Sequence, residues 1–583
     1  MPEKTDHTSQ IFTVSFDALA TDGRAIGHLP PENEDTTRGI TVFCEGLLPG
    51  ETAEVRILSQ KKNYATAECM KRITSSLDRI EPFCPVFGDC GGCTLQHLSY
   101  EGSLAVKRNH VMSSLIRIGK QSPDLIASVT RPILGMPFPY DYRNHMQYPV
   151  GETIVADDAS SGTSAATKLA ATSDSATAPA PAAMSATRQL RIGLYSSQSH
   201  TIVPHKTCRI AHPACESVRS ATESFCLDNG IFGYDEAAGH GFLRHLIVRV
   251  GVRTGEVMVI LVGHVRPEEE HGFPVDAYVE HLKESLKKDR RKYANIDNNL
   301  SNKVAHDADT ASIPWMLKSV WLNCNPTGLR QGQTVSSRKE NQKHLWGKTN
   351  IREIIGKNTY TISPLSFFQV NTSQAEILYD TVRAFARSEY APSEAPLRQD
   401  ASDKKNLYSK GSIFEESSMP ENDDDADLPL LHEDSKIQTL VDIYCGTGSI
   451  GLHLARDAGR IIGIENSESA VHDARDNAAR NGIEHATFIS ARAEDILPTD
   501  LPKTIDCIIL DPPRSGCDPK LLAVVSMLSP EKIIYVSCDP ATLARDIAVL
   551  TESRYIMKIV QPVDVFAWNG HVESVVLMSR VDK

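Results

Sequence analysis

Five apolar runs separated by helix-like segments dominate the chain from Leu440 to its end. They read TLVDIYC, RIIGIE, TIDCIILDPP, KIIYVSC and SVVLMSR. Strand-type runs that alternate with helical patterns are typical of a parallel, doubly wound sheet. Ligands of such sheets bind at the carboxyl ends of the strands. We therefore predict a Rossmann-like domain and expect its chemistry just beyond the strand ends.

The first of these strands runs into a glycine-rich turn, in LVDIYCGTGSIGLHLA. Gly446, Gly448 and Gly451 satisfy G-x-G-x-x-G, which alone is a weak signal. Glu465 ends the next strand, where a carboxylate can accept hydrogen bonds from both hydroxyls of a ribose. This unit indicates a dinucleotide or S-adenosylmethionine. Asp442, within the first strand, and a later Asp-Pro-Pro segment favour the methyl donor.

That later segment, IILDPPRSG, places Asp511 at the carboxyl end of a strand. Its two prolines fix the backbone and remove two N–H donors, so they form a rigid ledge. Similar Asp-Pro-Pro and Asn-Pro-Pro segments occur in amino-group methyltransferases. One interpretation is therefore an enzyme that methylates the exocyclic amine of a base.

A cysteine just past the end of a strand suggests a different chemistry. In KIIYVSCDPATLARDI, Cys538 precedes a predicted helix and is either a packing residue at a bend or a nucleophile. Methylation of carbon 5 of a pyrimidine needs a thiolate that adds to carbon 6 and a base that removes the carbon-5 proton. Glu573, before the last strand, is a candidate base, although a glutamate there is more often a surface residue.

The motifs FFQVN, DIYCGTGSIGL, DPPRSG, VSCDPATLARD and HVES occur in this order. In order and spacing they resemble the RNA 5-methyluridine methyltransferase family, over nearly the whole chain. The resemblance implies that Cys538 is the nucleophile and Glu573 the proton-abstracting base. It places five residues at cofactor-contacting positions: Gln369, Tyr444, Ser449, Glu465 and Asp511.

Two positions depart from the family pattern. Ser449 stands where the family usually has asparagine, and its hydroxyl has a shorter reach for a hydrogen bond. Asp539 replaces the asparagine that commonly follows the nucleophile, and its charge would oppose ionisation of the thiol.

A second group of cysteines lies near the N-terminus, in FCPVFGDCGGCTLQH. Cys84, Cys90 and Cys93 form a C-x5-C-x2-C pattern that is typical of a metal or iron–sulfur site. Cys208 offers a fourth thiolate, with Cys215 as a spare, and zinc is also compatible with this chemistry. The resemblance implies a 4Fe–4S cluster held by Cys84, Cys90, Cys93 and Cys208, as in the ribosomal-RNA branch. We interpret the nearby His205 and His212 as solvated loop histidines.

The predicted fold is α/β and multidomain, with three parts. Residues 10–75 form a small OB-like β-barrel that resembles the RNA-binding TRAM domain, residues 76–360 a mixed α+β central domain, and residues 361–583 the catalytic domain. Segments near 156–187, 283–311 and 389–434 read as inserts, the first as a flexible loop and the last as a disordered acidic segment. We predict RNA contacts from two sets, namely Lys61, Lys62 and Tyr64 in the barrel and Arg143, Asn144 and Gln147 in the central domain.

The overall composition and charge of the chain further limit the class of protein to which it can belong. The start of the chain carries no signal-peptide core, and no long uncharged apolar run suggests a membrane span. Thirteen cysteines without a secretion signal argue against a disulfide framework. The net charge of −13 is concentrated partly in the acidic insert, so a local basic face is compatible with RNA binding.

Together these features predict a cytoplasmic, monomeric enzyme that methylates carbon 5 of a specific uridine with S-adenosylmethionine. The predicted substrate is large-subunit ribosomal RNA. Two alternatives remain: the same reaction on transfer RNA, and a non-catalytic iron–sulfur protein that binds RNA.

Overall fold

The computed structural model describes residues 7–29, 39–156, 186–197, 199–235, 238–300, 313–326, 335–387 and 437–581. Two of the predicted inserts, 156–187 and 389–434, lie almost entirely outside the described residues. None of the described helices is long and apolar enough to cross a membrane.

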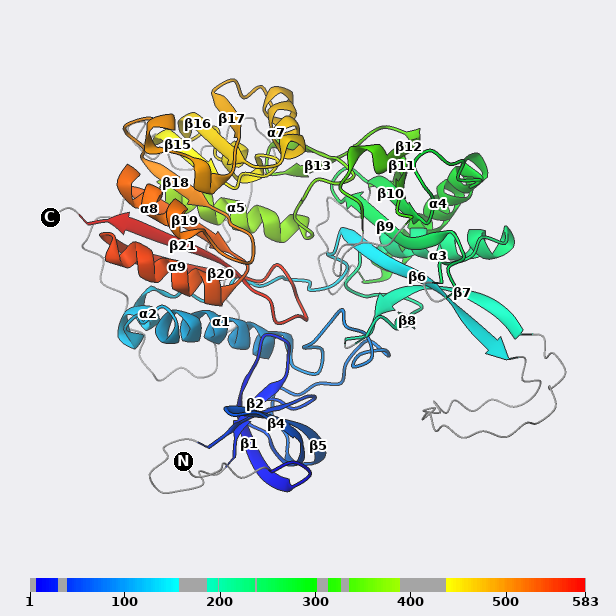
Figure 1. Ribbon diagram of the computed structural model, residues 1–583, viewed down its shortest axis with the longest axis horizontal. Coiled ribbons are helices and arrows are strands. Elements are labelled where there is room, and N and C mark those ends of the chain that lie inside the picture. The colour runs from blue at the N-terminus through cyan, green and yellow to red at the C-terminus, as the bar shows by residue number, and fades with distance from the viewer. Residues whose placement is uncertain are drawn as a thin grey trace.

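The N-terminal strands close into a barrel (Figure 1). They are β1 (Ile11–Leu19), β2 (Ala25–His28), β3 (Thr41–Cys44), β4 (Thr52–Gln60) and β5 (Tyr64–Thr74). Their order is β1-β2-β3-β5-β4, with only the β3–β5 pair parallel. Alternate side chains such as Val14, Phe16 and Val55 fill the interior. The prediction of a small β-barrel is therefore confirmed.

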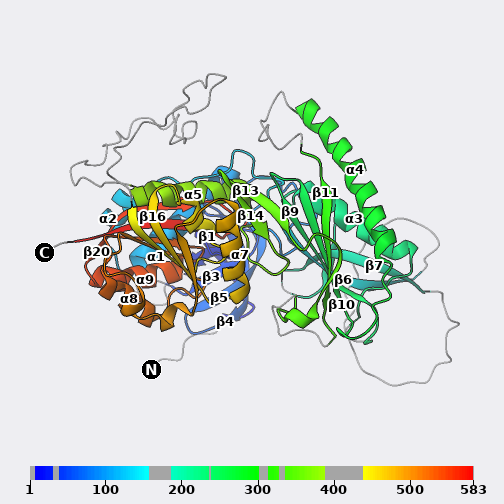
Figure 2. The same cartoon turned by 90° about the horizontal axis from the view of Figure 1, so that it is seen from above.

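The middle part of the chain forms a seven-stranded sheet, in the order β12-β11-β10-β9-β6-β7-β8. The strands are β6 (His145–Ala156), β7 (Ala186–Tyr195), β8 (Ile202–Pro204), β9 (Leu243–Gly251), β10 (Glu256–Gly263), β11 (Met316–Cys324) and β12 (Gln342–Gly347). Helices α3 (Pro213–Asp228) and α4 (Val275–Leu300) pack on this sheet, and their apolar side chains share a core with it (Figure 2). The basic run of the predicted insert near 283–311 is helical, because it lies within α4.

A short hairpin and a helix lead from this sheet to the catalytic domain. The hairpin is β13 (Ile351–Ile355) with β14 (Asn358–Ile362), and the helix is α5 (Thr372–Arg387). Asn371 caps α5, because its Oδ1 accepts a hydrogen bond from the Gln374 amide at 3.2 Å.

The catalytic sheet has seven strands in the order β17-β16-β15-β18-β19-β21-β20. They are β15 (Ile437–Ile443), β16 (Ala458–Glu465), β17 (Ala486–Ser490), β18 (Cys507–Leu510), β19 (Lys532–Ser537), β20 (Tyr555–Val563) and β21 (Glu573–Arg580). The first five are parallel, whereas β21 runs antiparallel between β19 and β20. This confirms the predicted Rossmann-like domain.

Helices cover both faces of this sheet. Helix α5 and α7 (Glu468–Arg480) share one core with it, while α8 (Pro519–Leu528) and α9 (Pro540–Glu552) share the other. Helices α1 (Tyr100–Arg117) and α2 (Pro123–Val129) join this second core, although the chain reaches them directly after the barrel (Figure 1). The predicted central segment 76–360 therefore contributes two helices to the catalytic layer.

Candidate active site

The candidate nucleophile and the candidate base lie at the ends of two neighbouring strands. Strands β19 and β21 pair antiparallel, with Ser537 opposite Ser574. Continued by one residue beyond the strand, this register brings Cys538 beside Glu573, close enough for the Glu573 charge to raise the pKa of the thiol. Two residues that are 35 positions apart in the chain thus meet at the carboxyl end of β19.

Burial sets the protonation of this pair. It raises the pKa of the half-buried Cys538 thiol to about 11, with added repulsion from Glu573 and Asp511 and a smaller one from Asp539. Glu573 is 5% exposed, and burial followed by the charge of Asp511 raises its pKa to about 8. The expectation that Asp539 opposes ionisation of the thiol is confirmed in direction.

Arg514 is the cation of this group. Its charge lowers the pKa values of both Cys538 and Glu573, against the effect of burial. One guanidinium nitrogen lies 3.4 Å from Nε2 of His571, in the loop before β21. Sequence reasoning missed this residue, although it directly follows the two prolines of the Asp-Pro-Pro segment.

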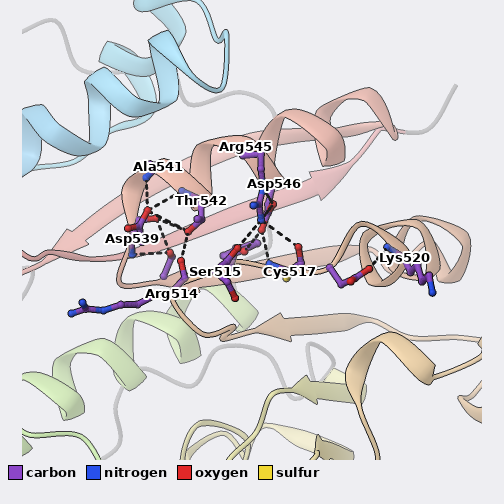
Figure 3. A network of polar contacts seen from close by, with 12 residues as sticks. Arg514, Ser515, Cys517, Lys520, Asp539, Ala541, Thr542, Arg545 and Asp546 are labelled. Carbon is purple, nitrogen blue, oxygen red and sulfur yellow. Dashed lines mark hydrogen bonds and ion pairs between the residues drawn. The ribbon is translucent and has the colours of Figure 1, made fainter. Parts of the chain in front are cut away.

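The loop that carries Arg514 is fastened to α9 (Figure 3). Asp546 accepts hydrogen bonds from the Cys517 amide at 2.8 Å and the Tyr535 hydroxyl at 2.6 Å. Arg545 donates to the Ser515 carbonyl at 3.0 Å. The side chain of Arg514 extends away from this network (Figure 3), and its charge acts on the Cys538 thiol.

Asp539 has a structural role that the sequence reading did not assign. Its Oδ1 accepts hydrogen bonds from the amides of Ala541 and Thr542, both at 2.9 Å, so it caps α9 (Figure 3). A capped helix start directly after Cys538 fixes the direction in which the chain leaves this residue.

The glycine turn and its carboxylate form a preorganised pocket edge. The two carboxylate oxygens of Glu465 accept hydrogen bonds from the amides of Gly446, at 3.1 Å, and Ser467, at 2.8 Å. Gly448 has a φ of 78°, and a Cβ there would lie 3.1 Å from the Phe488 ring. The turn therefore requires glycine, and each Glu465 oxygen keeps a lone pair for a ribose hydroxyl.

Two further carboxyl groups lie beside this turn. Burial raises the pKa of Asp511 to about 7. It also raises the pKa of Asp442 to about 7, although the Gly451 amide donates to Asp442 at 2.9 Å. Two such groups hold protons near neutral pH and can donate hydrogen bonds as well as accept them.

Of the other predicted cofactor residues, Tyr444 and Ser449 flank the glycine turn, whereas Gln369 lies in the segment before α5. Tyr444 has a φ of 66°, a strained conformation for a bulky residue, at the start of the glycine turn. Gln369 is 8% exposed, and its carbonyl accepts a hydrogen bond from Asn144 at 3.1 Å. The Ser449 hydroxyl accepts a hydrogen bond from the Tyr379 hydroxyl at 3.0 Å, so part of its hydrogen-bonding capacity is used within the protein.

The loop before Glu573 is held by a buried ion pair. Lys107 of α1 lies 2.5 Å from Asp564, and both side chains are fully buried. Lys107 also donates to the Phe566 carbonyl at 2.8 Å, and the Tyr100 hydroxyl donates to Asp564 at 2.7 Å. Helix α1 thereby positions the segment between β20 and β21.

The four cysteines predicted as a set meet around one small cavity. Cys84, Cys90, Cys93 and Cys208 line a space of about 30 Å³. Burial raises the pKa values of Cys93 and Cys208 to about 12. Within the described residues, however, no three Cys, His, Asp or Glu side chains converge closely enough to hold a single metal ion.

Three expectations near these cysteines are wrong. Cys215 is no spare ligand of this cavity, because it is a fully buried residue of α3 and does not line the cavity. His205 is not solvated, since its side chain is 5% exposed and lies 3.4 Å from Glu216. His212 caps α3 by accepting a hydrogen bond from the Ala214 amide.

The two predicted RNA-facing sets differ in outcome. Lys61, Lys62 and Tyr64 are exposed at the β4–β5 turn, and their contact with RNA stays a prediction. Asn144 is only 4% exposed, and its amide donates to the Gln369 carbonyl and the Thr372 hydroxyl. Asn144 therefore ties the central sheet to α5, and its assignment to RNA binding is wrong.

The fold and the glycine turn with its ribose-type carboxylate define a methyltransferase-type domain. A family model described as tRNA (Uracil-5-)-methyltransferase matches residues 430–581, and a TRAM domain model matches residues 8–70. An uncharacterized RNA methyltransferase of Halalkalibacterium halodurans is 31% identical over 572 residues, which cover 98% of this chain and 97% of the relative. A second, from Clostridium tetani, is 31% identical over 581 residues, covering 99% and 98%.

The chain therefore belongs to the RNA uracil-5-methyltransferase family, as its motifs predicted. A solved structure has the same fold: the Pyrococcus abyssi tRNA (uracil-54, C5)-methyltransferase in complex with S-adenosyl-L-homocysteine. Its TM-score is 0.59 at 21% identity, and the match covers 97% of this chain and 100% of that one.

Proposed function

We propose that the protein methylates carbon 5 of a uridine in RNA through a covalent adduct with Cys538. The observation that carries the proposal is the strand register that sets Cys538 opposite Glu573, at the edge that also holds Asp511 and Glu465. Base-amine methylation needs neither a thiol nor a second acid at this place, so this pair favours carbon methylation.

The same edge fits S-adenosylmethionine. Glu465 is oriented by two backbone amides toward ribose-type hydroxyls, and the glycine turn leaves room that a Cβ would fill. Further contacts with the cofactor would come from Gln369, Tyr444 and Asp511. Ser449 would contribute less, because its hydroxyl already accepts a hydrogen bond from Tyr379. When bound, the cofactor supplies an electrophilic methyl group on a sulfonium.

The residues of the chain then account for each proton and bond. The Cys538 thiolate adds to carbon 6 of uracil, and the electron pair of the 5,6 double bond makes carbon 5 nucleophilic. After carbon 5 has taken the methyl group, Glu573 removes the carbon-5 proton, and the electron pair left behind expels the Cys538 thiolate. Because Glu573 must be free for that proton, the thiol proton of the partly exposed Cys538 passes to solvent before the addition step.

The target uridine has to leave its base stack to reach a half-buried thiol. The barrel, with Lys61, Lys62 and Tyr64 exposed on one turn, is suited to hold the RNA backbone and stack a base. We propose large-subunit ribosomal RNA as the substrate. Transfer RNA is the second candidate, because a fold match over 97% of this chain is to a protein titled a tRNA methyltransferase.

We further propose that Cys84, Cys90, Cys93 and Cys208 hold a 4Fe–4S cluster. Four thiols on one cavity are the donor set that such clusters use, and a cluster spaces its thiolates more widely than a single zinc ion does. The cavity of about 30 Å³ is smaller than a cluster, so the cysteine loop would have to move outward. The cluster's role would be structural, since Phe83 and Trp568 pack beside Cys93 and Cys208.

The decisive experiment is methyl transfer from labelled S-adenosylmethionine to unmodified ribosomal and transfer RNA, assayed separately. Label in 5-methyluridine supports the proposal, and the labelled fraction identifies the RNA. Label in another nucleoside, or no label from a protein with an intact cluster, would refute it. Cys538→Ala should abolish transfer and leave RNA binding unchanged, while Cys69→Ala, at an exposed barrel cysteine, serves as the matched control.

The cluster is tested on the purified protein by iron and sulfide content and by visible absorption. Iron and sulfide in equal amounts, lost in Cys90→Ser, support the cluster. Zinc without sulfide, or no metal in anaerobically purified protein, would contradict it.

A further inference from the structure

The loop that directly precedes the proposed base joins the last two strands of the catalytic sheet. It consists of residues 564–572 and is called the base loop below. It connects β20 to β21, and Val563 pairs with Glu573 across its two ends. Because a displacement of about 1 Å can cost a catalytic group about 100-fold in rate, the base loop needs a fixed shape.

The base loop is tied to the cysteine loop by two backbone hydrogen bonds. The cysteine loop is residues 84–93, which contribute three of the four cysteines on the small cavity. The carbonyl of Trp568 accepts hydrogen bonds from the amides of Thr94, at 3.0 Å, and Leu95, at 3.1 Å. These two residues directly follow Cys93. One carbonyl therefore joins the four-cysteine cavity to the loop that precedes the base.

The side chain and backbone of Trp568 are fixed from several sides. Trp568 is only 2% exposed, and its Nε1 donates a hydrogen bond to the Pro139 carbonyl at 2.7 Å. Its ring centroid lies 5.2 Å from that of Phe83 and 5.6 Å from that of Tyr140. Its φ of 62° is a strained value for a bulky residue. Such a conformation persists only where the surroundings hold it, so these contacts keep the base loop in its present shape.

Other segments reinforce the same attachment. The Tyr142 hydroxyl donates to the Ala567 carbonyl at 3.0 Å. Tyr142 and two of the four cysteines pack against the apolar cluster that contains Trp568. The base loop also meets the barrel, because a Cβ on Gly570 would lie 2.1 Å from the Thr21 carbonyl oxygen. The base loop is thus held largely by segments that precede the catalytic domain in the chain.

We propose that Trp568 is a positioning residue for Glu573, and that the four-cysteine site serves the reaction by holding the base loop through it. The proposal rests on the proposed roles of Cys538 and Glu573. It does not depend on which metal group the four cysteines bind. A change in the contacts between the two loops should slow the step that uses Glu573, which is the release of methylated RNA.

The test removes single hydrogen bonds to the base loop in the full-length protein, purified anaerobically. Trp568→Phe loses the bond to Pro139, and Tyr142→Phe loses the bond to Ala567. Each should slow release of methylated RNA from Cys538 about tenfold or more and accumulate a covalent RNA–protein band on ordinary uridine RNA. The rate of methyl transfer and the dissociation constants for RNA and S-adenosylmethionine should stay close to the wild-type values, because the base acts after these steps.

Two matched controls lose hydrogen bonds of the same kind in the central domain. They are Trp321→Phe and Tyr278→Phe, and both should release product at the wild-type rate. Hydrogen–deuterium exchange gives a second readout that needs no catalysis. The amides of Thr94 and Leu95 and those of the base loop should exchange faster together in Trp568→Phe, and in neither control.

The outcomes separate positioning from a purely structural role. Slower release together with faster exchange supports the proposal. Wild-type release in Trp568→Phe and Tyr142→Phe overturns it, even if thermal stability falls, and so does equally slow release in the controls. Tyr142→Phe decides the question alone if Trp568→Phe does not fold. A wild-type protein that forms no adduct on 5-fluorouridine RNA would contradict the proposed function instead, while exchange would still report whether the two loops are coupled.

Discussion

Replacing Glu573 with glutamine removes the proposed base and keeps the size of a side chain that is only 5% exposed. Glutamine cannot take up the carbon-5 proton, so the methylated RNA should stay attached to Cys538. The loss of a general base typically lowers a rate by about 100- to 10,000-fold. We expect that loss in the turnover of Glu573→Gln.

The raised pKa values give this prediction a pH signature. With a pKa of about 8, roughly one Glu573 in ten is ionised at pH 7 and about nine in ten at pH 9. The Cys538 thiolate, with a pKa of about 11, increases about tenfold per pH unit over the same window. Methyl transfer precedes the step that uses Glu573, so the logarithm of its wild-type single-turnover rate should rise with a slope near one. The rate constant for release of methylated RNA from Cys538 should rise with a slope near one below pH 8 and level off above it.

The assay combines quenched-flow methyl transfer with denaturing gels. Glu573→Gln should transfer the methyl group with the wild-type pH slope, release the product without the pH dependence of Glu573, and accumulate a covalent RNA–protein band on ordinary uridine RNA. The wild-type protein should show such a band only on 5-fluorouridine RNA, where carbon 5 carries no removable proton. Glu531→Gln, at an exposed position before β19, is the matched control. A rate of product release by Glu573→Gln within threefold of the wild-type rate, with the wild-type dependence on pH, would refute this reasoning.

Three further predictions concern charge and stability. Asp539→Asn should speed adduct formation on 5-fluorouridine RNA several-fold, because it removes a charge that raises the pKa of Cys538 and keeps the α9 cap. Asp539→Ala loses the cap, so its free energy of unfolding in urea should fall by about 0.5–2 kcal/mol. Asp442 has a raised folded-state pKa of about 7, so its contribution to stability is complete below about pH 4 and is lost as the pH rises through 7. The free energy of unfolding should fall from pH 5 to pH 8, and Asp442→Asn should remove at most about 3 kcal/mol of that fall; an unchanged profile would contradict the assignment. Lys107→Met should lower the free energy of unfolding by about 3–5 kcal/mol, since it leaves Asp564 charged and buried. Arg492→Ala, at an exposed pair, should leave the free energy of unfolding nearly unchanged, and similar losses in both variants would argue against a buried ion pair.

The sequence by itself determined the elements whose signals are local. Apolar runs and turn residues predicted the strands of the catalytic sheet, and the glycine turn with Glu465 lay within one strand–helix–strand unit. Cys538 could be placed at the end of a strand because the run before it and the Asp-Pro after it are both local signals. The barrel strands were predictable for the same reason.

Only the tertiary structure decided which distant residues meet. Strand β21 enters the sheet antiparallel beside β19, and this register sets Glu573 opposite Cys538. Helix α1 packs on the catalytic sheet, so Lys107 reaches Asp564 across 457 positions of the chain. Asn144 looked polar and exposed in sequence but is buried between the central sheet and α5. Pairing of strands and burial of polar groups depend on contacts between segments far apart in the chain, and no local pattern of residues encodes them.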